Sequence, residues 1–161
     1  MSKTDSLHYK LCCEGAKWMK KHTYKYVAVE LICTTAENPD VWGTNGFNSM
    51  LIEVKTSRTD FLNDKKKFVR QKQNARFALG NFRYYLAPAG LINKEELPEN
   101  WGLLEWDGKN ISVIKRAEMQ PVENHPELSV LCSIMRREGI KNQIFNYRKN
   151  HETDTNEQRR V

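Results

Sequence analysis

The stretch that most limits what this chain can fold into is residues 38–55, N-P-D-V-W-G-T-N-G-F-N-S-M-L-I-E-V-K. Residues 50–55 are apolar apart from Glu53 and Lys55, which predicts a buried strand that carries two charges at its end. Because successive side chains of a strand alternate between faces, Glu53 and Lys55 share one face and their apolar neighbours take the other. A carboxylate and an ammonium are costly to bury together, so we expect them to pair or to bind a ligand.

A second carboxylate, Asp40, is predicted to lie beside that strand. Pro39 favours an extended chain before it, and the apolar residues 41–42 after it are typical of a short strand. Residues 43–46, Gly-Thr-Asn-Gly, have the composition of a turn, because Asn-Gly readily adopts positive φ angles. The two strands therefore fold back as a hairpin that brings Asp40 close to Glu53.

Pro-Asp, a hairpin-length gap and Glu-Val-Lys at the end of an apolar strand resemble the signature of the PD-(D/E)XK nuclease superfamily. The sequence T-S-R-T-D-F after the strand and the later W-G-L-L-E-W-D-G are similar to its small DNA-repair members of the MmcB type. The resemblance covers roughly residues 17–116. It implies a restriction-endonuclease-like α/β fold with an αβββαβ core, in which helices flank a central mixed sheet. A C-terminal β-hairpin and helix are added to this core by the sequence pattern.

The resemblance also implies a metal-dependent endonuclease that hydrolyses DNA phosphodiester bonds in repair, recombination or mobile-element processing. Asp40 and Glu53 would coordinate Mg²⁺ or Mn²⁺ together with the backbone carbonyl of Val54, an oxygen set that suits a hard cation. Lys55 would orient or deprotonate the attacking water, and orientation is the role that we favour. Glu30, in the preceding predicted strand, would be a further metal ligand or a group behind the ligands; the alternative is a Glu hydrogen-bonded at a strand edge.

The spacing of apolar residues also predicts helices and strands outside residues 38–55. A helix that Asp5-Ser6 caps runs to about residue 22, and Glu14 on it is an accessory ligand candidate, with a solvated helix face as the alternative. A further helix is expected at 128–137. Strands are expected at 24–33, 82–87, 102–106 and 111–115.

A basic helix is predicted from residue 56 to about residue 79. At 100° per residue, Lys65, Lys72 and Arg76 fall along one border of its apolar stripe, which indicates contacts with DNA phosphates. The alternative is a solvated helix face whose lysine stems cover the edge of the core. Arg58, at the start of this helix, joins the predicted DNA-binding group. Gln71 and Gln73 are accessory candidates, because some superfamily members use a Gln on this helix to hold substrate.

Length and composition agree with one globular domain. The chain has 161 residues, of which 39% are hydrophobic, and we expect a nuclease-like domain at 1–139 and a charged, flexible tail at 140–161. Its net charge of +6 suits DNA as a partner without proving it. Four cysteines without Cys-x-x-Cys spacing argue against zinc and disulfides and for reduced, buried thiols.

No apolar run approaches the ~20 residues that span a bilayer, and the N-terminus lacks the apolar core of a signal peptide. We therefore expect a soluble, cytoplasmic protein without a membrane partner, and the sequence leaves a homodimer open. Two other functional classes compete with the nuclease. One is a nucleic-acid-binding module that keeps the fold without turnover, and the other is a structural protein in which Asp40, Glu53 and Lys55 form an ion-pair network.

Overall fold

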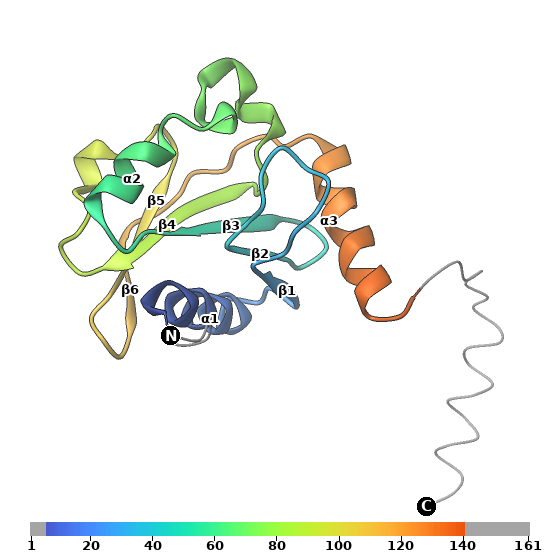
Figure 1. The fold of residues 1–161 in the computed structure, drawn as a ribbon, viewed down its shortest axis with the longest axis horizontal. Coiled ribbons are helices and arrows are strands. Elements are labelled where there is room, and N and C mark those ends of the chain that lie inside the picture. The colour runs from blue at the N-terminus through green and yellow to red at the C-terminus, as the bar shows by residue number, and fades with distance from the viewer. Residues whose placement is uncertain (1–5, 141–161) are drawn as a thin grey trace, which may run out of the picture.

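A computed structural model describes residues 6–140 of the chain, and these residues form an α/β fold. Among them, strands form one mixed sheet in the order β1-β2-β3-β4-β5-β6 (Figure 1). Pairs β3–β4 and β4–β5 are parallel, and the other neighbours are antiparallel. The strands are β1 Tyr26–Val29, β2 Val41–Thr44, β3 Ser49–Val54, β4 Phe82–Pro88, β5 Gly102–Trp106 and β6 Ile111–Lys115.

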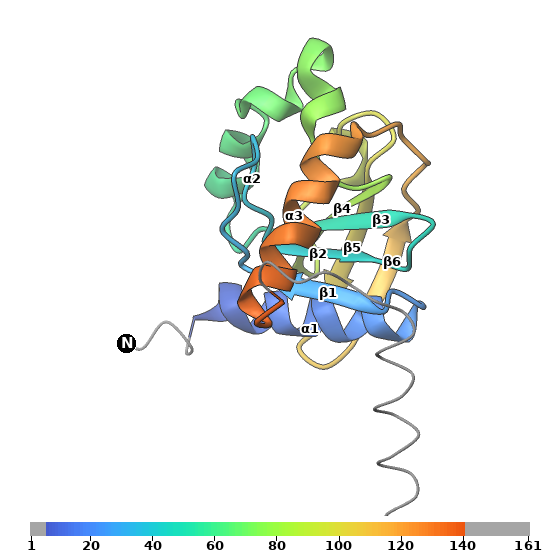
Figure 2. The same ribbon diagram turned by 90° about the vertical axis from the view of Figure 1, so that its right-hand side faces the viewer.

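Helices cover both faces of the sheet (Figures 1 and 2). α1 (Leu7–Lys21) packs on one face, while α2 (Arg58–Asp64) and α3 (Asn124–Arg137) pack on the other. The side chain of Ser6 accepts a hydrogen bond from the Tyr9 N–H, so the predicted N-terminal cap is confirmed. The predicted mixed sheet with flanking helices is therefore present, as is the antiparallel pair β5–β6.

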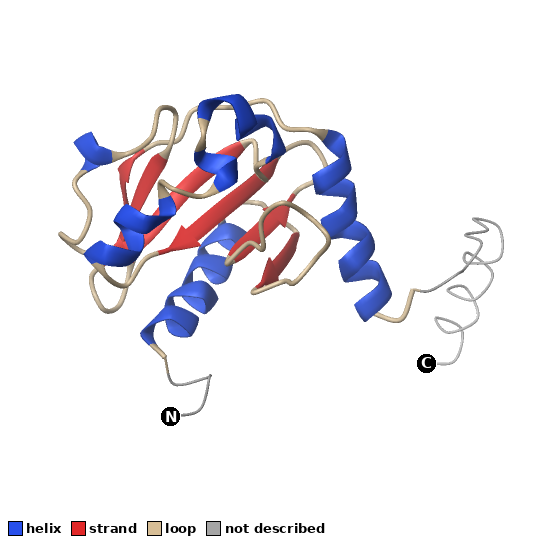
Figure 3. Cartoon of the chain, turned by 45° about the horizontal axis from the view of Figure 1, so that its top comes forward, coloured by secondary structure: helices blue, strands red, loops and turns tan. Residues whose placement is uncertain are grey.

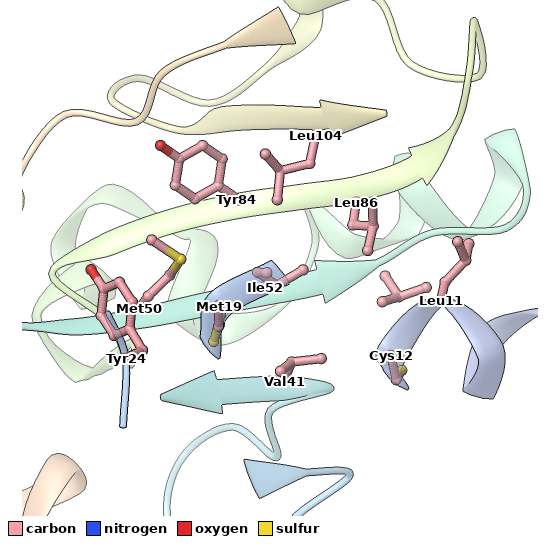
Figure 4. Close-up of a cluster of buried hydrophobic side chains, with 11 residues drawn as sticks. Leu11, Cys12, Met19, Tyr24, Val41, Met50, Ile52, Tyr84, Leu86 and Leu104 are labelled. Carbon is pink, nitrogen blue, oxygen red and sulfur yellow. The ribbon is translucent and has the colours of Figure 1, made fainter. Parts of the chain in front are cut away.

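The core lies in layers that follow the alternation of the strands. Leu11, Cys12 and Met19 of α1 pack against side chains on one face of the sheet, including Ile52 and Leu86 (Figure 4). On the opposite face the buried residues include Leu51, Phe61, Tyr85, Trp101 and Leu103. The face of β3 that carries Glu53 and Lys55 is this second face, so both charges point into a buried layer, as the alternation predicted.

Two predicted elements have wrong bounds near the N-terminal and C-terminal ends of the domain. The strand predicted at 24–33 ends at Val29, because Glu30 adopts a left-handed conformation with φ +46° and its N–H bonds to the carbonyl of Asp40 at 2.8 Å. α3 begins at Asn124 rather than at residue 128. Pro126 is compatible with this earlier start, since the N–H that proline lacks would have no partner in the first turn of a helix.

The predicted helix at 56–79 is wrong after its first turns. α2 ends at Asp64 and is followed by two separate 3₁₀ helices, η2 (Phe68–Arg70) and η3 (Lys72–Phe77), which appear as short coils in Figure 3. Arg70 Nε donates to Asp64 Oδ2 at 2.8 Å, and both side chains are buried. In a continuous helix these residues would point about 120° apart, so the break in the chain lets both turn inward.

The expectations about the cysteines, membrane spans and the C-terminal tail compare with the structure as follows. The four cysteines are free, but only Cys12 is buried as predicted, because Cys13 and Cys33 are half-buried and Cys132 is exposed. No helix among residues 6–140 is both long enough and apolar enough to cross a membrane. The predicted tail lies outside the described residues, apart from Ile140.

Candidate active site

A pocket of about 260 Å³ opens where the start of β2 meets the end of β3. β2 pairs antiparallel with β3, so the residue before Val41 lies next to the residue after Ile52. The predicted hairpin is thereby confirmed, but its turn lies at residues 45–48 rather than 43–46, because Gly43 and Thr44 pair with β3 as part of β2. Nine residues line the pocket: His8, Asp40, Glu53, Val54, Lys55, Asp60, Asn63, Asp64 and Lys67.

Asp40 is held at the pocket by the backbone of the neighbouring strand. Its Oδ2 accepts a hydrogen bond from the Val54 N–H at 2.8 Å. Its Oδ1 lies 3.4 Å from His8 Nε2, and the side chain is 22% exposed. The structure therefore brings Asp40, Glu53 and Val54 together, as the sequence predicted.

Glu53 is buried, with its side chain 1% exposed. Its Oε2 accepts hydrogen bonds from Lys67 Nζ at 2.8 Å and from Lys55 Nζ at 3.3 Å. Its Oε1 is also buried and has no hydrogen-bond partner among the described residues. Burial raises the pKa of Glu53 to about 7, with Asp40 adding to the effect and Arg70 opposing it.

Lys55 is as deeply placed as Glu53, with 4% of its side chain exposed. Its Nζ lies 3.0 Å from Asp64 Oδ1 and 3.9 Å from Asp60 Oδ1, in addition to its contact with Glu53. Several carboxylates thus hold one ammonium at a defined point of the pocket wall.

Behind the pocket, Arg70 joins the buried carboxylates. Its Nη1 lies 2.7 Å from Glu37 Oε1, its Nε donates to Asp64, and its guanidinium lies 4.5 Å from the centre of the Trp101 ring. The Tyr85 hydroxyl also donates to Asp64 Oδ2 at 2.6 Å. Burial opposes ionisation of Asp64, but Arg70 and neighbouring lysines outweigh it and hold the pKa of Asp64 well below its usual range.

The charges of this buried group balance. Its three carboxylates face three cations, and the six members are Glu37, Glu53, Asp64, Lys55, Lys67 and Arg70. Asp40 and Asp60 are the pocket-lining carboxylates outside this balanced group. The pocket therefore carries excess negative charge when Glu53 is ionised and His8 is neutral.

His8 is one of the pocket residues that sequence reasoning missed. It lies in the first turn of α1, with Nε2 toward Asp40 and Nδ1 3.6 Å from both Glu30 Oε1 and Cys12 Sγ. The interaction with Asp40 raises the pKa of His8 above its ordinary value, although burial opposes this. The spacing of His8 and Cys12, four residues apart on one helix face, is the sequence signal that could have found this cluster.

Sequence reasoning also passed over Asp60, Asp64, Lys67 and Arg70. Their signal was weak, because acidic and basic residues in a polar helix are ordinarily solvated. Only the break of the chain after Asp64 turns Arg70 inward.

The structure does not place Glu30 in β1 or among the residues that line the pocket. It lies just past the strand end, with its Oε1 3.6 Å from His8 Nδ1, and its role at a metal stays a prediction. Glu14 is not brought to the pocket either. Its carboxylate pairs with Lys17 Nζ at 2.7 Å, one turn along α1.

The predicted DNA-binding residues do not form the predicted stripe, because the helix that would align them is broken. Lys65 packs over the Phe61 ring, Arg76 packs over the Phe77 ring, and Lys72 is exposed. None of these three lines the pocket. Contact with DNA phosphates stays a prediction for them.

Arg58, the fourth predicted DNA-binding residue, and the accessory candidates Gln71 and Gln73 have local partners. Arg58 forms a paired contact with the Glu96 carboxylate at 2.7 and 2.8 Å. Gln71 Oε1 accepts from the side-chain amides of Gln73 and Asn74. Neither glutamine lies in the pocket, so a role in holding substrate there is not supported by their position.

The donor set can be tested against a divalent cation. Glu53 Oε1 is a buried carboxylate oxygen without a hydrogen-bond partner, and Asp40 Oδ1 is not needed for the bond to Val54. Two carboxylate oxygens beside excess negative charge fit Mg²⁺ or Mn²⁺. A second group of potential ligand atoms, from His8, Cys12 and Asp40, lies within 4.8 Å of one another.

No family model matches the chain, and no curated protein matches it. Among solved structures, it is similar to the SPO1766 protein of unknown function from Silicibacter pomeroyi. The two are 20% identical with a TM-score of 0.62, over 88% of this chain and 99% of that chain. At this identity the likeness concerns the fold alone.

Proposed function

We propose that this protein is a metal-dependent deoxyribonuclease of the PD-(D/E)XK type, which hydrolyses DNA phosphodiester bonds with Mg²⁺ or Mn²⁺. One observation carries the proposal: Asp40, Glu53 and Lys55 line one pocket, in which Glu53 Oε1 is buried without a hydrogen-bond partner. Burying a carboxylate oxygen without a partner costs free energy, and a bound cation would offset that cost. We infer a role in DNA repair, recombination or mobile-element processing from the sequence resemblance.

The order of elements supports the same proposal. α1, β1, β2, β3, α2 and β4 follow one another as in the αβββαβ core that the resemblance implies, with β3 parallel to β4. β5, β6 and α3 are added after that core. Because one fold hosts many functions, this order supports the reading only together with the pocket.

The pocket residues of the motif then have defined roles. Asp40, Glu53 and the carbonyl of Val54 would hold the ion, which supplies polarisation of the scissile phosphodiester and stabilises the charge that develops on its oxygens. Lys55, fixed by Glu53 and Asp64, orients the attacking water.

Lys67 lines the pocket with 44% of its side chain exposed, so a DNA phosphate could reach its ammonium in competition with Glu53 and Asp64. On the inner side, Arg70 holds the carboxylate of Glu53 in place, with Arg70 Nη2 3.5 Å from Glu53 Oε2.

A non-catalytic nucleic-acid-binding module is the second candidate, and Lys67 also provides the observation in its favour. Its Nζ lies 2.8 Å from Glu53 Oε2 and 2.7 Å from Asp64 Oδ1. The protein's own cation therefore already neutralises part of the charge that a metal would meet. In this reading the buried ion pairs stabilise the fold and the pocket has no turnover.

Cleavage of labelled duplex, single-stranded, flapped and four-way-junction DNA with Mg²⁺ or Mn²⁺ tests the two candidates. We expect cleavage that EDTA abolishes and that Asp40→Asn and Lys55→Ala each remove. Asp107→Asn is the matched control, since Asp107 is an exposed turn residue far from the pocket residues in the chain. DNA binding without metal-dependent cleavage on any substrate would favour the second candidate.

A further inference from the structure

We infer that His8 Nε2 is a further protein ligand of the ion held by Asp40, so that the site has a mixed nitrogen and oxygen donor set and prefers a first-row transition cation over Mg²⁺. This inference rests on the proposed function for the position of the ion. The inference goes beyond the proposed function because it names the class of cation and a ligand that is not part of the Pro-Asp and Glu-Val-Lys motif.

The separation of the two donor atoms carries the inference. His8 Nε2 and Asp40 Oδ1 are 3.4 Å apart. This is longer than the ~2.7–3.2 Å of an ordinary N–H···O hydrogen bond. Two atoms that are each about 2.1 Å from one ion lie about 3.0 Å apart at a right angle and about 3.4 Å apart at a tetrahedral angle. The observed distance therefore matches two ligands of one cation.

The other ring nitrogen of His8 has partners of the kind that a metal-bound histidine uses. Its Nδ1 lies 3.6 Å from Cys12 Sγ, within hydrogen-bond range for sulfur, and 3.6 Å from Glu30 Oε1, which is an ion-pair contact rather than a hydrogen bond. Histidine ligands typically donate their second N–H to a carboxylate or carbonyl, which selects the tautomer and aims the ring. With the proton on Nδ1, the lone pair of Nε2 is directed toward Asp40.

The backbone holds both carboxylates around the same imidazole. The Glu30 N–H donates to the carbonyl of Asp40 at 2.8 Å, which ties the end of β1 to the start of β2. Glu30 adopts this position with φ +46°, a conformation that costs energy for a residue other than glycine. The strained residue is thus the one that places a carboxylate on the far side of His8.

Cys12 orients the His8 ring rather than binding the ion. Its Sγ contacts Nδ1, and one ion cannot bind both nitrogens of the same ring. The expected donors are therefore one imidazole nitrogen and carboxylate oxygens. Imidazole favours transition metals, while Mg²⁺ favours oxygen ligands and keeps its waters.

Binding of Co²⁺ and Mg²⁺ to the tag-free full chain, measured by calorimetry without DNA, tests the inference. We expect Co²⁺ to bind at least about tenfold more tightly than Mg²⁺. His8→Ala should lower Co²⁺ affinity about 10- to 100-fold while changing Mg²⁺ affinity much less. His22→Ala is the matched control, because His22 lies at the other end of the same helix and stacks on Trp18.

Proton NMR of the Co²⁺ complex gives a second readout. A ring N–H proton of His8 should appear strongly shifted by the paramagnetic ion, present in His22→Ala and absent in His8→Ala. Equal losses of Co²⁺ and Mg²⁺ affinity in His8→Ala, or no loss, would overturn the inference, as would Co²⁺ binding that Cys12→Ser alone removes.

The outcomes also separate this inference from the proposed function. If Asp40→Asn abolishes binding of both ions while His8→Ala has no effect, the metal site stands and the role of His8 is wrong. If neither ion binds the unmodified chain, the proposed metal site itself is wrong.

Discussion

The carboxylate of Asp40 accepts a hydrogen bond from the backbone N–H of Val54, at 2.8 Å. One oxygen of Asp40 is thereby committed to the end of β3, while the other faces His8. This bond joins the chain before β2 to the strand that carries Glu53 and Lys55, so it aligns the pocket as well as stabilising the hairpin.

Replacement of Asp40 separates these two contributions. Asp40→Ala removes the acceptor and should lower the free energy of unfolding by about 1–3 kcal/mol, because the Val54 N–H loses its charged partner. Asp40→Asn keeps a side-chain oxygen that can accept this bond and should cost much less stability. Urea denaturation measures both, and metal titration should show weak binding in both variants. Equal stability losses would argue against the hydrogen bond as the cause.

Arg70→Met should lower the free energy of unfolding by about 3–5 kcal/mol, since it leaves Glu37 and Asp64 buried without their shared cation. The side chain of Arg70 is only 2% exposed, so water cannot replace it. Urea denaturation tests this, with Arg58→Met as the control. Arg58 pairs with Glu96 at the surface and should matter far less. A small loss for Arg70→Met would show that the buried carboxylates become protonated instead.

The pH dependence of metal binding follows from Glu53, whose pKa of about 7 lies far above its ordinary value of 4.5. The ion binds the ionised carboxylate, so a proton competes with it below pH 7. Affinity for Co²⁺ should be nearly constant above about pH 7.5 and should fall by up to about tenfold per pH unit below pH 7. His8, whose pKa is also raised, adds competition in the same direction. Calorimetric titrations from pH 5.5 to 8.5 measure this, and a constant affinity over that range would contradict it.

Lys65 and Lys72 are predicted to contact DNA phosphates even though the helix that would align them is broken. Each alanine replacement should weaken binding to all DNA sequences alike and should reduce the salt dependence of log K by about 0.9 per lost contact. Lys94→Ala serves as the control, because Lys94 is an exposed lysine of another segment, η4 (Lys94–Glu96). If Lys65→Ala and Lys72→Ala behave like the control, the solvated-face alternative is correct.

Local pattern was sufficient where the relevant neighbours are close in sequence. The alternation of residues 50–55 placed Glu53 and Lys55 on one face, and turn residues predicted the β2–β3 hairpin that brings Asp40 to them. The bounds of β5 and β6 follow from the same kind of information, because strand residues and the Asp-Gly turn between them are contiguous. In a regular helix or strand the direction of each side chain follows from the repeat of that element, which can be recognised in the local sequence.

Only the tertiary structure decided where a regular helix or strand ends. Helical spacing runs without a break through residues 56–79, yet α2 ends at Asp64, because Arg70 must turn inward to reach Glu37 and Glu53. Those partners lie 33 and 17 positions before it in the chain. His8 likewise meets Asp40 across 32 positions. A buried charge is stable only beside its counter-charges, and which distant segments supply them is settled when the sheet and helices pack, not by local spacing.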